Sequence, residues 1–207
     1  GSRFAPDMLG SLVYVGGLAI EEALDIIGID GSRVGDELER IGYNGATPCP
    51  GLTPHAFVEL HIEQGPVLEK TNVIIGAVTG VQGISWQEVT ITGQSNHAGT
   101  TPMNMRRDPS YVAAKIAVFL RDVADRYAGH QVCTVGKVDL FPNLINVIPA
   151  KAVMTLDVRN TEEVILRQAE KEIADFITSL SKEENVVITT RQLARFEPVV
   201  FHPRVID

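Results

Sequence analysis

Cysteine is scarce in this sequence. Only Cys49 and Cys133 occur among 207 residues, and they lie far apart without C-x-x-C spacing. A disulfide framework or a cysteine-rich metal site needs more cysteines in a recognisable pattern, so we expect neither. We therefore predict a reducing, cytoplasmic setting.

Positive charge and long apolar runs are also missing. The 18 basic and 26 acidic side chains give a formal charge of -8, and no Lys/Arg block could follow a phosphate backbone. We therefore expect no nucleic-acid partner and no anionic membrane surface. The longest apolar run is broken well before the roughly 20 residues that a membrane-spanning helix needs. The first residues, GSRFAPDML, show no secretion signal.

The first part of the chain predicts helices, a loop and one strand. Residues 10–41 are expected to be helical with a break at Gly28–Gly31, and a second short helix is expected over Val34–Ile41. The run AFVELHIEQ, residues 56–64, is typical of a strand. These elements suit part of an α/β domain, because helices and one strand cannot close such a core by themselves.

From residue 84 the pattern becomes regular, with elements in the order β-α-β-β-α-β. The expected strands are 84–93, 132–141, 151–159 and 186–193, and the expected helices are 108–126 and 162–180, the second capped by Thr161. This order predicts a sandwich in which two helices cover one face of a four-stranded antiparallel sheet. We predict an α+β fold with a partial α/β domain over residues 1–80, a complete sandwich over 81–193, and a last segment, 194–207, that returns to the first domain.

His61 is the first candidate for chemistry. It lies at the end of the predicted strand and is followed by Glu63 and Gln64. Ligands of open parallel sheets bind at the carboxyl ends of strands, and His is the commonest nitrogen ligand of zinc-like metals. A hydrogen-bonded core histidine is the alternative interpretation of this residue alone.

A second histidine, His97, lies in the stretch GQSNHAGTTPMNMRRD, residues 93–108. Gly99 and Pro102 follow it and predict a turn that leads into the next helix. We interpret Arg106, Arg107 and Asp108 as a solvated helix start with local ion pairs. The residues of this stretch alone leave open what a lone histidine does at the front of such a turn.

Three stretches together resemble a known family. They are FVELHIEQGPVLE, GISWQEVTITGQSNHAGTTPMNMRRD and PNLINVIPAKAVMTLDVRN. They are similar to the carbamoylase branch of the di-metal, aminopeptidase-like hydrolases, which contains N-carbamoyl-L-amino acid hydrolases, β-ureidopropionases and allantoate amidohydrolases. The resemblance covers nearly the whole chain. The residues of the motifs are most similar to those of the hydantoin-pathway members.

The resemblance implies a metal-dependent hydrolase that cleaves the carbamoyl C–N bond of an N-carbamoyl-L-amino acid. Two divalent metal ions (Zn, Mn, Co or Ni) would serve each active site of the full-length enzyme. The substrate would be a small ureido molecule with a carboxylate. Residues 1–80 would belong to the catalytic domain, and residues 81–193 would be a lid through which the enzyme forms a homodimer.

The resemblance also assigns roles to individual residues. His61 matches a metal ligand, and Gln64 matches a residue that touches the substrate. His97 matches a histidine that stabilises the oxygen of the scissile ureido group, often from the neighbouring subunit. Asn146 and Arg159 match the residues that hold the substrate carboxylate.

The remaining family residues are expected outside this sequence. In relatives an acidic pair that holds the general base comes directly before G-S-R-F, and this chain begins Gly1-Ser2-Arg3-Phe4. A further ligand lies near the family's C-terminus. We therefore expect a central fragment that is inactive alone and retains no di-metal centre. The alternatives are an allantoate amidohydrolase, a β-ureidopropionase, a related di-metal aminopeptidase, and a non-catalytic dimerisation or binding module.

Overall fold

The computed structural model describes residues 3–6 and 8–207, so Gly1 and Ser2 of the expected G-S-R-F start lie outside it. Backbone contacts divide the chain into unit 1, Gly1–Gln64, and unit 2, Gly65–Asp207. The predicted domain limits, 1–80, 81–193 and 194–207, stay a prediction. No helix in the described part of the chain is long and apolar enough to cross a membrane.

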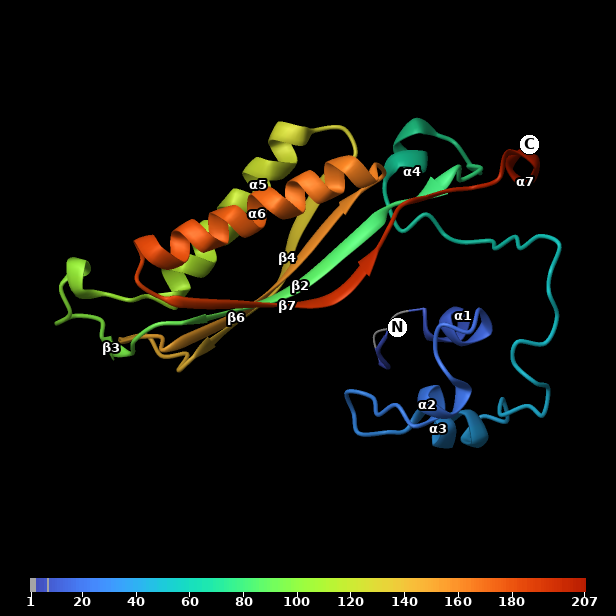
Figure 1. Ribbon diagram of the computed structural model, residues 1–207, viewed down its shortest axis with the longest axis horizontal. Coiled ribbons are helices and arrows are strands. Elements are labelled where there is room, and N and C mark those ends of the chain that lie inside the picture. The colour runs from blue at the N-terminus through green and yellow to red at the C-terminus, as the bar shows by residue number, and fades with distance from the viewer. Residues whose placement is uncertain (1–2, 7) are drawn as a thin grey trace. The chain divides into compact units, whose positions relative to one another are not determined.

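The described residues of unit 1 form three short helices, which Figure 1 labels. They are α1 (Leu9–Tyr14), α2 (Ile20–Leu24) and α3 (Val34–Arg40). The predicted helix from Val34 is confirmed, and the expected long helical stretch before it is broken into two pieces. Only Ala23, Val34 and Gly35 are buried in these helices. Unit 1 therefore has almost no core of its own.

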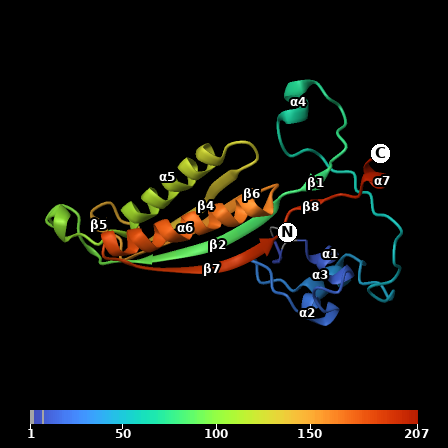
Figure 2. The ribbon, with the colours of Figure 1, turned by 45° about the horizontal axis from the view of Figure 1, so that its top comes forward.

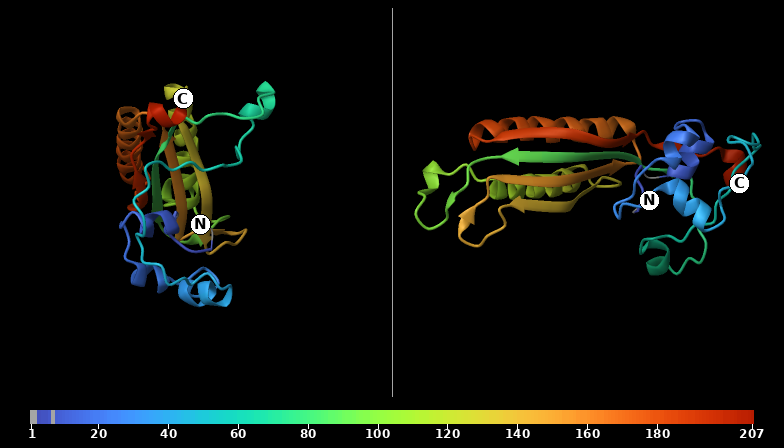
Figure 3. Two further views of the ribbon diagram at one scale, coloured as in Figure 1. Left: turned by 90° about the vertical axis from the view of Figure 1, so that its right-hand side faces the viewer. Right: turned by 90° about the horizontal axis from the view of Figure 1, so that it is seen from below.

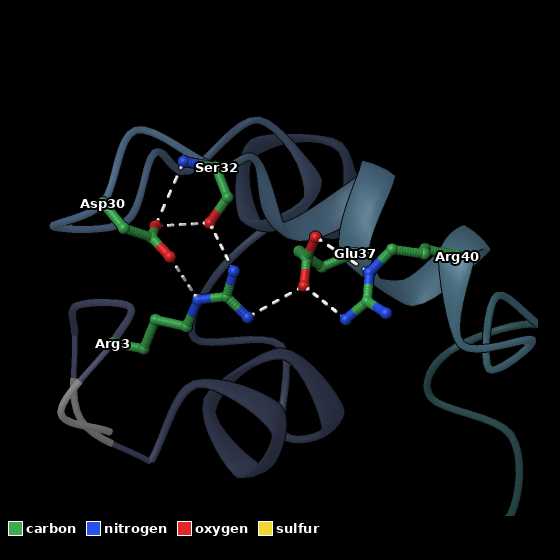
Figure 4. Close-up of polar contacts among 5 residues, drawn as sticks. All are labelled: Arg3, Asp30, Ser32, Glu37 and Arg40. Carbon is green, nitrogen blue, oxygen red and sulfur yellow. Dashed lines mark hydrogen bonds and ion pairs between the residues drawn. The ribbon is translucent and has the colours of Figure 1, made fainter.

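Polar contacts join the beginning of unit 1 to α3 (Figure 4). Arg3 Nε lies 2.8 Å from Asp30 Oδ2, and Arg3 Nη1 lies 2.8 Å from Glu37 Oε2. Hydrogen bonds from Ser32, reinforced by Arg3, lower the pKa of Asp30 to about 2. Hydrogen bonds from Arg40 and then Arg3 lower the pKa of Glu37 to about 2. Both carboxylates are thus held in their charged form.

The predicted strand over residues 56–64 is wrong for this structure. The segment has no regular secondary structure, and Leu60 and Ile62 are 96% and 75% exposed. Among residues 3–6 and 8–207, no strand pairs with it. A single strand leaves its N–H and C=O groups without a ladder, so apolar composition alone does not hold it extended in a sheet.

Unit 2 is built on a four-stranded antiparallel sheet of order β4-β6-β2-β7 (Figure 1). Its elements are β2 (Gly83–Thr92), α5 (Pro109–Tyr127), β4 (Val132–Phe141), β6 (Lys151–Asn160), α6 (Glu163–Glu183) and β7 (Val187–Phe196). Their order is the predicted β-α-β-β-α-β. The expected Thr161 cap is wrong, because α6 is preceded by Glu162, whose N–H donates to Asn160 Oδ1 at 2.9 Å.

Buried and half-buried residues alternate along β6, so its side chains point in turn to the two faces of the sheet. Every second residue from Ala152 to Asn160 is buried, and α5 and α6 both pack on β6. The core formed there is apolar and includes Met154, Leu156, Ile116 and Ile173. Among the described residues of unit 2, no helix packs on the opposite face, which carries Asp157 and Arg159, and the right-hand view of Figure 3 shows the strand layer from that side. This face remains half-exposed.

Short elements extend the sheet at its two ends (Figure 2). At one end β3 (Asn96–His97) pairs with β5 (Val147–Ile148), close to the 3₁₀ turn η1 (Met103–Met105). At the other end β1 (Gly80–Val81) pairs with β8 (Val199–Val200). Two short helices complete unit 2, α4 (Val67–Thr71) and α7 (Pro203–Ile206).

Candidate active site

The loop that carries His97 leaves the sheet after β2 and returns at the start of α5. Its base is closed by two hydrogen bonds: Gly93 N–H donates to Ala150 O at 2.8 Å, and Gln94 N–H donates to Arg107 O at 3.0 Å. A Cβ at position 93 would lie 2.2 Å from Arg107 O. Only glycine permits this close approach, so the loop is anchored where it begins.

The structure brings His97 and Asn146 together at one end of the sheet. His97 on β3 is opposite Val147 on β5, and the N–H of Ala98 donates to Asn146 O at 2.9 Å. Both His97 and Asn146 are exposed. Two of the predicted site residues are therefore neighbours on paired segments.

The main chain selects the tautomer of His97. Gly99 N–H donates to His97 Nδ1 at 3.0 Å, so Nδ1 is an acceptor and carries no proton. In the neutral ring the proton then lies on Nε2, which makes Nε2–H a hydrogen-bond donor. A Cβ at Gly99 would lie 3.2 Å from His97 Cε1, so the absence of a side chain there lets the peptide reach the ring.

Arg106 is a residue that the sequence interpretation missed. Its Nη2 donates to Ala98 O at 2.6 Å and its Nε donates to Thr101 O at 3.1 Å. The hydroxyl of Thr101 donates to His97 O at 2.7 Å. The side chain of Arg106, half-buried, thus closes the turn around His97 instead of forming the ion pair expected at a helix start.

Asp108 lies at the helix start, as the sequence predicted, but it caps α5 through main-chain N–H groups and not through the expected ion pair. Its Oδ1 accepts from Ser110 N–H at 2.9 Å and from Tyr111 N–H at 3.4 Å, and Pro109 occupies the first helical position. These contacts satisfy main-chain donors that α5 leaves open at its beginning. The His97 loop is therefore fixed at its far end as well as at its base.

Arg159 lies at the other end of the sheet from His97 and Asn146. It is near the last residue of β6, whereas β5 precedes the first residue, Lys151. At about 3.3 Å per residue, Lys151 and Arg159 are roughly 26 Å apart along the strand. The predicted pairing of Asn146 and Arg159 around one carboxylate is therefore not formed within a single chain.

The guanidinium of Arg159 is held in place by its neighbours. Its Nε and Nη2 donate to the two oxygens of Asp157 at 2.9 and 2.7 Å, and its Cζ lies 5.7 Å from the ring centroid of Trp86. Such a bidentate pair fixes the plane of the fork. A substrate carboxylate at this position would share the guanidinium with Asp157.

His61 and Gln64 belong to unit 1 and are exposed. His61 Nδ1 hydrogen bonds the carbonyl oxygen of Ile62. Gln64 has φ 54°, an uncommon backbone conformation for a residue other than glycine.

A family model described as "Peptidase dimerisation domain" matches residues 79–185, which is more than half of the chain and contains the long elements from β2 to α6. The chain belongs to the peptidase dimerisation-domain family. The match contains His97, Arg106, Asn146 and Arg159.

Relatives extend the family similarity over the whole chain. The chain is 37% identical over 207 residues to an N-carbamoyl-L-amino-acid amidohydrolase of Rhizobium meliloti, covering 100% of this chain and 50% of the relative. It is 36% identical to an allantoate amidohydrolase of Escherichia coli (strain K12), covering 96% of this chain and 49% of the relative. The chain therefore spans about half the length of the curated relatives it matches.

A solved structure gives the same result for the fold. A hydantoinase/carbamoylase family amidase from Burkholderia multivorans matches with a TM-score of 0.86 and 39% identity, over 100% of this chain and 50% of that chain. The predicted resemblance to the carbamoylase branch is thereby confirmed. The roles of His61, Gln64, His97, Asn146 and Arg159 stay predictions.

The described residues of this chain do not supply all the ligands of a metal centre. Among residues 3–6 and 8–207, no group of three or more His, Cys, Asp or Glu side chains is placed to hold a metal ion. A closed site needs three or four protein ligands, and His61 supplies one. The described residues therefore do not form by themselves the di-metal site that the resemblance implies for the full-length enzyme.

Proposed function

We propose that the full-length protein hydrolyses the carbamoyl C–N bond of N-carbamoyl-L-amino acids. The observation that carries the proposal is the His97 tautomer: an exposed loop presents Nε2–H as a donor beside Asn146. The similarity to N-carbamoyl-L-amino-acid amidohydrolases over the whole chain supports the same reaction class.

The chemistry explains why such a donor is needed. The nitrogen lone pairs of a ureido group feed its carbonyl, so attack by water places negative charge on the carbonyl oxygen. A donor already aimed at that oxygen stabilises the transition state without reorganisation. In our proposal His97 Nε2–H is this donor, and Gln64 contacts the substrate.

Arg159 would hold the substrate carboxylate, since a planar guanidinium fork matches a carboxylate. The separation of roughly 26 Å along β6 means that one small substrate cannot touch Arg159 and His97 of the same chain. We therefore propose that His97 and Asn146 of one subunit act on a substrate held by Arg159 of another. A homodimer through the lid would satisfy this requirement.

The exposed residues of the sandwich favour the edge formed by α5 and β4 as the contact between two subunits. On α5, Tyr111 and Val118 are 52% and 62% exposed, and β4 beside it is an edge strand. Exposed ion pairs occur on both helices, such as Arg121 with Asp125 on α5 and Lys171 with Asp175 on α6, and the exposed large apolar side chain of α6 is Val164, at 77%. An unpaired edge strand beside an apolar helix face invites pairing across a two-fold axis, so we propose α5 and β4 as the contact.

The catalytic proposal is tested by assaying the full-length protein on three substrates: N-carbamoyl-L-methionine, allantoate and a dipeptide. We expect kcat/KM to be highest for N-carbamoyl-L-methionine. If kcat/KM is highest for allantoate, allantoate is the substrate and our assignment of N-carbamoyl-L-amino acids is wrong. Preference for the dipeptide would favour an aminopeptidase, and hydrolysis of none of them would favour a non-catalytic module.

A further inference from the structure

The two hydrogen bonds on either side of one peptide group connect Arg106 to His97. The carbonyl oxygen of Ala98 and the N–H of Gly99 belong to the same planar peptide unit. That oxygen accepts from Arg106 Nη2 at 2.6 Å, and that N–H donates to His97 Nδ1 at 3.0 Å. The guanidinium therefore acts on the imidazole through a single rigid group.

We propose that Arg106 is a positioning residue for His97, acting through the Ala98–Gly99 peptide. A charged donor on the carbonyl oxygen fixes the rotation of the peptide plane and strengthens its N–H as a donor. The N–H in turn holds the imidazole with Nδ1 as acceptor and Nε2–H pointing away. Arg106 touches no reacting atom in this scheme.

A second hydrogen bond of Arg106 fixes how its guanidinium lies across the turn that follows His97. Arg106 Nε donates to Thr101 O at 3.1 Å, so the guanidinium spans the turn from Ala98 to Thr101. The N–H and hydroxyl of Thr101 both reach His97 O, at 3.2 and 2.7 Å. The backbone of His97 and its ring are thus restrained by one connected set of bonds, with Arg106 as its only charged member.

Lysine could not reproduce this arrangement. Its ammonium is a point charge on a flexible stem, whereas the fork reaches two carbonyls at once. The neighbouring Arg107 offers a matched control, because its exposed side chain faces the amide of Asn185 and, among the described residues, forms no hydrogen bond to the turn over residues 97–101. The inference rests on the proposed function for its effect on catalysis, but its effect on His97 is independent of any assay.

The first test is 15N NMR of His97 in the folded 207-residue chain, with circular dichroism to verify folding. We expect the Nε2–H tautomer to dominate in the unmodified chain and in Arg107→Ala. In Arg106→Ala the two tautomers should become mixed, and Arg106→Lys should lie between. An unchanged His97 spectrum in Arg106→Ala and Arg106→Lys would overturn the proposal, whatever the enzyme does.

The second test is kinetic and uses the full-length protein with N-carbamoyl-L-methionine. Arg106→Ala should lower kcat roughly tenfold to a hundredfold with little change in KM, the scale of a misplaced catalytic group. Arg106→Lys should recover part of the loss, and Arg107→Ala should match the parent. In a His97→Ala background the Arg106→Ala change should have no further effect on kcat, because its partner is gone.

If the losses in kcat caused by Arg106→Ala and by His97→Ala multiply in the double variant, Arg106 acts on general stability, and the proposal is wrong. The two hypotheses fail separately. If His97→Ala retains normal turnover while Arg106→Ala still mixes the tautomers, the catalytic role proposed for His97 fails and the positioning role of Arg106 stands.

Discussion

Residues 56–62 of unit 1 and 84–91 of unit 2 are both rich in apolar side chains, yet only the second stretch contributes to a core. Leu60 is 96% exposed, whereas Val89 and Ile91 are fully buried. The difference lies in the neighbours: β2 has a strand on each side and helices above it, while 56–62 has no sheet partner among the described residues. Burial depends on a complementary surface as much as on composition.

The largest expected effect comes from the same substitution made in both regions. Leu156→Ala should lower the free energy of unfolding of the 207-residue chain by roughly 2 to 5 kcal/mol, because it opens a cavity under α5 and α6. Leu60→Ala should change it by less than about 0.5 kcal/mol. Urea titrations followed by far-UV circular dichroism and by Trp86, the single tryptophan, measure both. An equal loss for Leu60→Ala would mean that residues 56–62 are packed.

The two histidines provide the next comparison, in the full-length protein. His97→Ala should lower kcat by about a hundredfold or more, with unchanged metal content, because an oxyanion donor is lost. His61→Ala should lower the bound metal measured by elemental analysis, since it removes a ligand. Near-normal turnover of His97→Ala in a folded dimer would make His97 a structural turn residue.

Arg159 separates substrate binding from turnover at the opposite end of the sheet. Arg159→Lys keeps the charge but loses the planar fork, so we expect a strong rise in KM. The kcat effect should be smaller than that of His97→Ala, although weaker substrate binding also weakens any closure of the lid. Steady-state kinetics on N-carbamoyl-L-methionine decide this, and a pure kcat effect at Arg159 would contradict the carboxylate role.

Two exposed valines test which helix of unit 2 meets another subunit. Val118→Glu on α5 should convert the proposed dimer of the full-length protein to monomer at micromolar concentration, because it places a charge in the proposed contact. Val164→Glu on α6 is the matched control and should leave the dimer intact. Light scattering with size-exclusion chromatography reports the mass. Dissociation by Val164→Glu alone would move the interface to α6.

The smallest expected effect concerns the acidic pH range. The pKa values of Asp30 and Glu37 are lowered to about 2 in the folded chain, so their stabilisation is complete above their ordinary values and is lost as pH falls towards 2. Hydrogen-exchange protection of α3 should therefore fall between about pH 4.5 and 2, before that of β6. Arg3→Gln should reduce this pH dependence, and an unchanged profile would show that the contacts in Figure 4 contribute nothing.

The sequence predicted most of unit 2 because its signals are local. Alternation in 84–92 and the apolar stripe of α5 each identify an element without reference to the rest of the chain. The strand predicted over 56–64 was wrong because a strand needs a non-local partner. The apolar pattern of the segment indicates which side chains could be buried, but it does not indicate whether a partner strand is present.

The site was predictable only in part. His97 and Asn146 became neighbours through β3 and β5, which are too short to show periodicity. Arg106 was missed because its partners are main-chain carbonyls, which have no signature in the sequence. The separation of Arg159 from Asn146 could have been found, since the predicted strand 151–159 already implies an extended distance.

The length of β6 has an evolutionary consequence. One residue inserted between Lys151 and Arg159 would shift every later side chain to the other face, which would bury the guanidinium under the helices and expose Val158. A viable change of length would need two residues, matched in the flanking strands β2 and β4. Loops at the ends are free of this alternation, so their length can change one residue at a time while the span of the sheet is preserved.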